Sequence, residues 1–539
     1  MQLIQRIFSI LFFGILLLAF WQCARRGTPS GGPKDVDPPV LLKAEPKNLS
    51  TNFNSKTIRL YFDEYIKLKD IQNQLIISPP LNYIPDIKPL GGPSKFIEIT
   101  LKDTLLKNTT YTFNFGQSII DHNEGNINSF LSYVFSTGNY IDSLALTGVV
   151  TDALNRNADA SISVMLYEID SIYNDSTIYK YPPNYLANTG DSLPIFELKN
   201  LKAGKYKIFA LKDEGRDYVF NQRADKIGFL EDTITLPSDS LPLLNLFKEI
   251  PDYRASVPSY VAKNRIIFGY TGNGDSITIR SLSQLPDSVR TLIKKERNKD
   301  SLNFWLTPTN IDSIVFKVTH EPFKVVDTFI VKTRKLPLDT LRLTPSHNGK
   351  INFEDRFYME ANTPLVKIDT ANIQILDKDS LKIGFKTRLE ATDNLAYIDF
   401  DLLEENRYDL TFLPGAFEDF FGMQNDTINI NLATTKYTDF GNMNLTISGD
   451  VRYPIIVQLI DDNEKIIRQQ VGDKPEIFVF KNLEPNKYGI RVIFDENQNG
   501  KWDTGSYLKK IQPERISYFP DIIDIRANWE MEQTFIISN

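Results

Sequence analysis

Residues 478–503, FVFKNLEPNKYGIRVIFDENQNGKWD, occur twice in this chain of 539 residues. The earlier copy is residues 196–221, FELKNLKAGKYKIFALKDEGRDYVFN, and the spacing of 282 positions (478 − 196) holds without a gap. Repetition at a constant spacing indicates a duplicated structural unit. In both copies apolar and polar residues alternate on either side of a turn, which predicts a strand, a turn and a second strand.

The composition predicts a protein of several β domains. A chain of this length exceeds what one hydrophobic core organises. Hydrophobic residues make up 42% and aromatic residues 12% of the chain, and aromatic residues favour strands. The net charge is −7 and no long basic run is present, so we expect no nucleic acid partner.

Cys23 is the only cysteine, and it follows Arg6 and an apolar run over residues 7–20. A basic residue followed by a short apolar run is typical of a signal peptide and is too short to span a membrane comfortably. With the cysteine at the cleavage point, the pattern resembles a bacterial lipoprotein signal, which implies acylation of Cys23 and a lipid anchor in the outer membrane. The periplasmic or cell-surface side stays open. The alternative is an ordinary cleaved signal with an unmodified thiol.

Two parts of the chain share an order of strand and turn patterns. Residues 58–62 (IRLYF), 111–115 (YTFNF) and 121–125 (DHNEG) follow one another in an order that resembles the bacterial Ig-like domain of envelope proteins from Bacteroidota. The resemblance implies a seven-stranded sandwich. Residues 408–412 (YDLTF) followed by 419–422 (DFFG) parallel the same order, which predicts a second such domain.

The duplicated unit resembles a different sandwich. Its first copy begins with residues 146–152 (LTGVVTD) and continues with 163–167 (SVMLY). These segments resemble the transthyretin-like or carboxypeptidase-regulatory-like module, which implies a non-catalytic role. Residues 252–332 contain further strand patterns and resemble no family. There we expect a short helix over residues 287–299, capped by Asp287, with Val289, Leu292 and Ile293 on one face.

We therefore predict an all-β protein of tandem Ig-like and transthyretin-like β-sandwich domains after a lipoprotein signal. The predicted divisions are the signal peptide 1–22, a tether 23–39, Ig-like domain 1 at 40–138, transthyretin-like domain 1 at 144–238, a β-sandwich insert at 252–335, Ig-like domain 2 at 340–436 and transthyretin-like domain 2 at 441–539.

The later copy ends in an acidic loop, DENQNGKWD over residues 495–503, which matches the first part of a calcium loop. Position 12 is Ser506 instead of glutamate, so another acid would have to come from elsewhere, and neither Asp462 nor Glu514 can be assigned to that place. The alternative is a hydrogen-bonded hairpin loop without metal. The predicted calcium ligands are the side chains of Asp495, Asn497, Asn499 and Asp503 and the carbonyl of Lys501.

No catalytic motif is present: the three histidines lack the spacing of a metal site or triad, and HExxH, GxSxG and P-loop patterns are missing. We expect a non-catalytic scaffold, held to the membrane by its lipid, that binds envelope or outer-membrane proteins in outer-membrane protein assembly or export. One alternative is a surface glycan-binding lipoprotein or adhesin, in which Trp305, Trp502 and Trp529 stack on sugar. Another is an enzyme of unrecognised type within residues 252–332.

Overall fold

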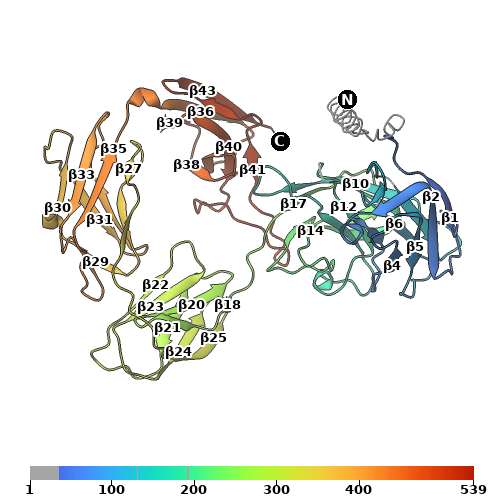
Figure 1. Cartoon of the computed structure of the whole chain (residues 1–539), viewed down its shortest axis with the longest axis horizontal. Coiled ribbons are helices and arrows are strands. Elements are labelled where there is room, and N and C mark those ends of the chain that lie inside the picture. The colour runs from blue at the N-terminus through green and yellow to red at the C-terminus, as the bar shows by residue number, and fades with distance from the viewer. Residues whose placement is uncertain (1–34, 130, 191–192, 539) are drawn as a thin grey trace, which may run out of the picture. The chain divides into compact units, whose positions relative to one another are not determined.

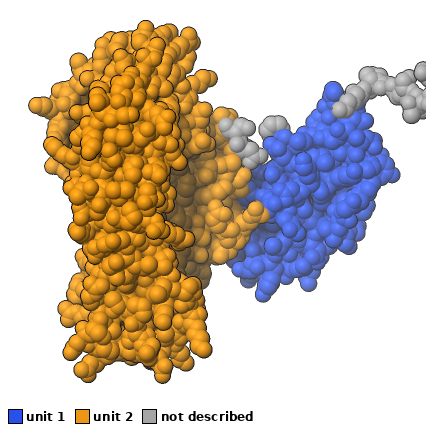
Figure 2. Space-filling model, turned by 60° about the vertical axis from the view of Figure 1, so that its left-hand side comes forward, with its two compact units in different colours: residues 1–143 blue, residues 144–539 orange. Residues whose placement is uncertain are grey.

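The structure is a computed structural model that describes residues 35–129, 131–190 and 193–538. Almost all of its elements are β-strands (Figure 1), which confirms the predicted all-β class. The chain divides into two compact units, residues 1–143 and 144–539 (Figure 2). The predicted signal, Cys23 and tether residues 23–34 lie outside the described residues. No helix in the described ranges is long and apolar enough to cross a membrane.

Unit 1 contains two sheets that share one core. Its strands are β1 (Leu41–Glu45), β2 (Thr57–Leu68), β3 (Ile76–Ser78), β4 (Asp86–Lys88), β5 (Ser94–Thr100), β6 (Thr110–Asn114), β7 (Ile119–Asp121), β8 (Ile127–Asn128) and β9 (Ser132–Ser136), with helix α2 (Ile71–Gln74). One sheet has the order β4-β5-β2-β7-β8 with β1 also on β2, and the other is β3-β6-β9. Alternate residues of β2, Ile58 and Leu60, are fully buried and meet Phe113 and Phe135 from the second sheet in this core.

The duplicated stretch lies in two domains of unit 2, repeat 1 (residues 144–247) and repeat 2 (residues 441–538), and the predicted strand, turn and strand are confirmed in both. Repeat 1 has β10 (Leu144–Asp152), β11 (Ser163–Glu168), β12 (Tyr185–Asn188), β13 (Ile195–Leu201), β14 (Gly204–Lys212), β15 (Lys226–Phe229), β16 (Ile234–Leu236), β17 (Leu243–Leu246) and the 3-10 helix η1 (Thr177–Tyr179). Repeat 2 has β36 (Gly441–Gly449), β37 (Ile455–Ile460), β38 (Ile466–Gly472), β39 (Ile477–Leu483), β40 (Asn486–Phe494), β41 (Ile516–Tyr518), β42 (Ile523–Ile525) and β43 (Glu530–Ile537).

The two repeats have the same sheet topology. Repeat 1 pairs β13-β10-β17 in one sheet and β12-β11-β14-β15 in the other, with β16 on β14. Repeat 2 pairs β39-β36-β43 and β38-β37-β40-β41, with β42 on β40. In both, the first strand runs parallel to the last. Leu244 and Leu246 of β17 belong to the core of repeat 1, although the predicted domain ends at residue 238.

Residues 254–332 form two sheets with a separate core. The strands are β18 (Arg254–Ala255), β19 (Ser259–Ala262), β20 (Arg265–Thr271), β21 (Ile277–Ser281), β22 (Thr291–Lys295), β23 (Ser301–Leu306), β24 (Ser313–His320) and β25 (Val325–Lys332). The helix predicted over residues 287–299, with Asp287 as its cap, is wrong, because β22 occupies its centre. Leu292 and Ile293 pair with Trp305 and Phe304 of β23. Strand pairing across the sheet therefore overrides an apolar spacing that also suits a helix.

Residues 341–435, where a second Ig-like domain is predicted, form a further set of sheets. The strands are β26 (Leu343–Pro345), β27 (Gly349–Lys350), β28 (Tyr358–Ala361), β29 (Leu365–Ile368), β30 (Ile373–Leu376), β31 (Lys386–Glu390), β32 (Leu395–Asp399), β33 (Arg407–Phe412), β34 (Phe417–Asp419) and β35 (Ile428–Ala433), with 3-10 helices η2 (Thr370–Asn372) and η3 (Tyr437–Asp439). The sheets are β26-β28-β32-β31, β27-β35-β33-β30 and β29-β34, around one core.

In unit 1 and in residues 341–435, the hydroxyl of a buried tyrosine accepts a hydrogen bond from a backbone amide at an equivalent position. Tyr111 accepts a hydrogen bond from Leu106 N at 2.9 Å, and Tyr408 accepts one from Leu403 N at 2.6 Å. Both pairs are separated by 297 positions (408 − 111). This arrangement resembles the tyrosine corner of Ig-like sandwiches. The same spacing relates two threonine hydroxyls, Thr137 with Thr109 N at 3.0 Å and Thr434 with Asn406 N at 3.2 Å.

We expect Tyr408→Phe to lower the free energy of unfolding of residues 341–435 by about 1–3 kcal/mol, because it leaves the amide of Leu403 without its acceptor. Thermal unfolding of the purified chain measures the effect. Tyr437→Phe is the control, since Tyr437 is 48% exposed. Equal melting temperatures for the two variants would contradict the role of the corner.

Candidate functional site

Each repeat carries an acidic loop, loop 1 (residues 213–225) after β14 and loop 2 (residues 495–514) after β40. The first aspartate of each loop accepts a hydrogen bond from the backbone N–H five residues later: Tyr218 N donates to Asp213 Oδ2 at 2.7 Å, and Gly500 N donates to Asp495 Oδ2 at 2.8 Å. Tyr218 and Gly500 both have positive φ, 58° and 77°. The aspartate–amide bond and the positive φ are kept even where tyrosine replaces glycine, so glycine is not required at this position.

A second carboxylate closes each loop from its far end. Asp225 accepts hydrogen bonds from the backbone amides of residues 214 and 221, at 3.0 and 2.7 Å. Glu514 accepts those of residues 496 and 503, both at 2.9 Å. These are the same two positions of the repeat, and we call Asp225 and Glu514 the clamp carboxylates. The structure therefore brings Glu514 to the loop, a placement that the sequence left unassigned.

The clamp in loop 2 concentrates negative charge in a sheltered place. Glu514 is 8% exposed and Asp495 is 2% exposed. Burial raises the pKa of Glu514, and the neighbouring carboxylates of Asp503 and Asp495 raise it further, against the lowering effect of its two amide donors. Burial also raises the pKa of Asp213 in loop 1.

The predicted calcium ligands lie together, but their oxygens already accept hydrogen bonds. Asp503 accepts hydrogen bonds from the side-chain amides of Asn497 and Asn499, the latter at 2.5 Å. Asn499 Oδ1 accepts a hydrogen bond from Lys501 N at 3.0 Å. In the described part of the chain, no group of three or more acidic, histidine or cysteine side chains is arranged to hold a metal ion. The donor set therefore fits the hydrogen-bonded loop without metal, the alternative given above, better than a calcium shell, and we take that alternative forward as the expectation.

We expect the melting temperature of the chain to be the same in excess calcium and in excess chelator, because loop 2 satisfies its own oxygens. A ligand that binds only the folded state would raise the melting temperature. A calcium-dependent rise that disappears in Asp503→Asn and persists in Asp473→Asn, an exposed control, would show instead that calcium displaces these hydrogen bonds.

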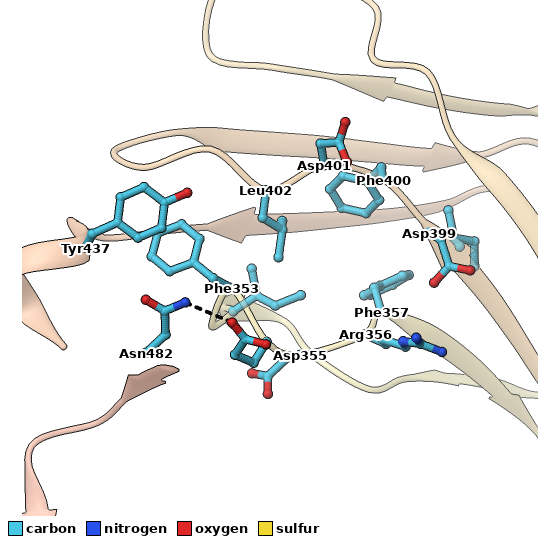
Figure 3. A pocket seen from close by; sticks show the side chains of 13 residues that line it. Phe353, Asp355, Arg356, Phe357, Asp399, Phe400, Asp401, Leu402, Tyr437 and Asn482 are labelled. Carbon is cyan, nitrogen blue, oxygen red and sulfur yellow. Dashed lines mark hydrogen bonds between the residues drawn. The ribbon is translucent and has the colours of Figure 1, made fainter. Parts of the chain in front are cut away.

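A cavity of about 420 Å³ lies where residues 351–357 and 398–402 meet Tyr437 and Asn482 (Figure 3). Phe353 and Tyr437 stack face to face, with ring centroids 4.2 Å apart, so each covers one face of the other. Asn482 of repeat 2 donates to Glu354 at 2.9 Å across the cavity border. The two rings therefore pack against each other and do not form the flat aromatic platform that the glycan-binding alternative needs.

The three tryptophans named for sugar stacking have packing partners. Trp305 is 1% exposed and lies under the guanidinium of Arg265 at 5.2 Å. Trp502 donates its indole N–H to the carbonyl of Glu514 at 3.0 Å. Trp529 is 45% exposed, with Arg526 4.9 Å from its ring. These contacts favour structural roles for all three.

His347 lies between a serine and an aspartate. Its Nδ1 is 3.0 Å from Ser346 Oγ and its Nε2 is 3.3 Å from Asp355 Oδ2. Ser346 Oγ also accepts Tyr358 N at 3.0 Å. Asp355 is also 3.8 Å from Arg468 of repeat 2. These contacts thus hold β26 to β28 and extend to repeat 2. The arrangement differs from the usual catalytic triad, in which the nucleophile approaches Nε2 of the histidine, because Ser346 is adjacent in sequence and contacts Nδ1.

Lys294 of β22 carries a desolvated ammonium group that donates to Asn394 Oδ1 at 2.5 Å. Burial lowers its pKa from 10.5 to about 8. Between these pH values the unfolded chain binds a proton that the folded chain does not, so stability should rise with pH across this window. We expect Lys294→Met to raise the free energy of unfolding at pH 7 by about 1–3 kcal/mol, measured as a higher melting temperature. The variant should also lose the rise of stability with pH. The exposed neighbour Lys295→Met is the control, and an equal pH slope in both variants would contradict the assignment.

Comparison with known proteins gives similarities to solved structures and a match to one domain family. Domains 1–6 of the surface layer protein SbsC are 11% identical to this chain, with 90% of this chain and 67% of that chain covered and a TM-score of 0.17. The four N-terminal Ig domains of Dscam1 isoform 4.4 are 8% identical, with 72% of this chain and 98% of that chain covered and a TM-score of 0.15. The Bacillus anthracis TIE protein is 11% identical, with 94% of this chain and 76% of that chain covered and a TM-score of 0.13. None of these overlaps identifies a function. No curated protein matches the chain in sequence. Residues 35–137 match the family described as Bacterial Ig-like domain.

Proposed function

We propose that the protein is a non-catalytic scaffold of the bacterial cell envelope, anchored by a lipid on Cys23, that binds outer-membrane or other envelope proteins during their assembly or export. The observation that carries the proposal is the match of residues 35–137 to a bacterial Ig-like domain, in a chain whose described remainder is also built of sheets around separate cores. Sandwiches of this kind present edges and loops to partners.

The edge of unit 1 at β4 supports protein binding. Among the strands of the described residues, β4 is the last of its sheet and pairs only with β5. Three apolar side chains flank it in an exposed state: Tyr83 at 64%, Ile84 at 80% and Leu90 at 85%. Exposed apolar side chains beside a free strand edge are suited to accept an extended segment of a partner protein.

Affinity purification in mild detergent tests partner binding. We expect envelope proteins to copurify with the chain, and the pair Ile84→Asp and Leu90→Asp to reduce their yield. Leu241→Asp is the matched control, because Leu241 is 75% exposed at a different place. Recovery of the chain alone, or equal partner yield from all variants, would contradict the proposal or the β4 edge, respectively.

The anchor is tested by Cys23→Ser. We expect this variant to leave the membrane fraction, because one thiol is the only attachment point for the lipid. Mature Cys23→Ser protein that stays with the membrane would contradict lipid anchoring.

The absence of catalysis is tested at Ser346. A fluorophosphonate probe reacts with activated serines, and we expect it to leave the chain unlabelled. Labelling that is lost in Ser346→Ala would show that the contact with His347 activates this hydroxyl, and it would overturn the non-catalytic assignment.

A further inference from the structure

Loop 2 contains a segment that loop 1 lacks. Loop 1 connects its two clamped positions, Asn221 and Asp225, through residues 222–224 (QRA). Loop 2 connects the equivalent positions, Asp503 and Glu514, through residues 504–513 (TGSYLKKIQP). We call residues 504–513 the strap. Since loop 1 closes with the shorter connection and the same amide–carboxylate bonds, the strap is not required to close the loop.

The strap inserts a tyrosine into repeat 1. Tyr507 is 2% exposed. Its ring lies 5.1 Å from Phe209 and 5.2 Å from Phe229, both edge to face, and 6.3 Å from Tyr179. We call Tyr179, Phe209 and Phe229 the socket. Edge-to-face packing of buried rings stabilises a contact beyond the area that it removes from water.

Polar contacts surround the inserted ring. Tyr507 donates its backbone N–H to Glu249, a carboxylate that is 3% exposed, and its hydroxyl lies 3.2 Å from Asp175 Oδ1. Lys510 Nζ is 2.9 Å from the same Asp175 oxygen. Two further bonds reach main-chain carbonyls: Gln512 Nε2 donates to Phe229 O of repeat 1 at 3.0 Å, and Thr504 Oγ1 donates to Lys248 O, directly after repeat 1, at 2.7 Å.

Neither repeat needs this contact for its own core. The core of repeat 1 contains no socket residue, and the core of repeat 2 contains no strap residue. Phe209 and Phe229 are nevertheless 1% and 2% exposed, on the face of their sheet that points away from that core. The strap therefore covers an apolar face that repeat 1 cannot bury against its own core.

We infer that the strap and the socket are a built-in docking pair that couples repeat 2 to repeat 1, so that the two repeats move as one body although about 200 residues separate them in sequence. Further bonds between the repeats add to it: Arg491 Nη1 and the Tyr518 hydroxyl donate to Leu154 O, the former at 3.2 Å, and Arg156 N donates to Glu464 at 2.9 Å. The strap is the larger part, because it supplies the buried ring. The inference goes beyond the scaffold role and does not depend on the lipid anchor or on any partner protein.

The chain itself supplies the test. In the full-length Cys23→Ser protein, residues 504–513 are replaced by the QRA connection of loop 1. A second variant is Tyr507→Ala, and Leu508→Ala is the control, because Leu508 lies in the strap but is 56% exposed. Small-angle scattering gives the radius of gyration. Cleavage by trypsin after Lys248, next to buried Glu249, reports the local contact.

We expect both the QRA variant and Tyr507→Ala to have a larger radius of gyration and faster cleavage after Lys248, and Leu508→Ala to match the parent. An unchanged radius and cleavage rate in the folded QRA variant would overturn the inference. If the QRA variant does not fold, Tyr507→Ala decides in the same way, because it leaves the backbone of loop 2 intact.

Discussion

Phe478→Ala is expected to lower the free energy of unfolding of repeat 2 by about 3–5 kcal/mol, because it removes a buried aromatic ring and leaves a cavity. Phe478 is 2% exposed and pairs with Leu445 across the sheet. Its ring fills the space over Gly472, where a Cβ would lie 2.5 Å from Cζ. Phe196 of repeat 1 also covers a glycine, its cross-strand partner Gly148, where a Cβ would lie 2.5 Å from Cζ, so Phe196→Ala should destabilise repeat 1 to a similar extent.

Thermal unfolding of the full chain measures both variants. Val479→Ala is the control for Phe478→Ala, because Val479 lies on the opposite face of the same strand and is 41% exposed. A shift in melting temperature no larger than that of the control would show that the ring is not a central part of the core.

Glu514→Ala is expected to have the next largest effect, about 2–4 kcal/mol on repeat 2, because it removes the acceptor of two backbone amides, and hydrogen bonds to a charged group are stronger than neutral ones. Hydrogen exchange at the amides of residues 496 and 503 gives a direct readout, since both donate to Glu514 at 2.9 Å. We expect exchange at both to accelerate.

Glu496→Ala is the control for this variant, because it keeps the backbone amide of residue 496 and removes only an exposed side chain. Unchanged exchange in Glu514→Ala would mean that the loop keeps its shape without the clamp. Asp225→Ala in loop 1 should reproduce the effect on the amides of residues 214 and 221.

The sequence predicted the parts of the fold that depend on local pattern. Alternation around Phe196 and Phe478 gave the strands β13 and β39, and the order of segments in residues 58–125 led to the Ig-like domain that the family comparison supports. The helix prediction at β22 was wrong because apolar residues at 289, 292 and 293 suit both a helix and a strand. Only pairing with the neighbouring strand β23 decides between the two.

The site was predicted in part. The opening residue Asp495 was found from the repeat, whereas Glu514 was named without a place in the loop and Asp225 was missed. Asp225 and Glu514 are 289 positions apart (514 − 225), so the strap breaks the constant spacing that revealed the repeat. A sequence signal did exist, because each clamp carboxylate lies one or two residues before the strand that follows its loop, β15 or β41. Tyr507 gave no signal, since its partners come from a distant part of the chain.

The carboxylate clamps have a practical consequence for protein engineering. They hold the two ends of each loop together, with three residues between them in loop 1 and ten in loop 2. A connection whose ends are held in this way tolerates added length at small entropic cost. Residues 222–224 are therefore a suitable place to graft an epitope tag or a reporter peptide into the chain.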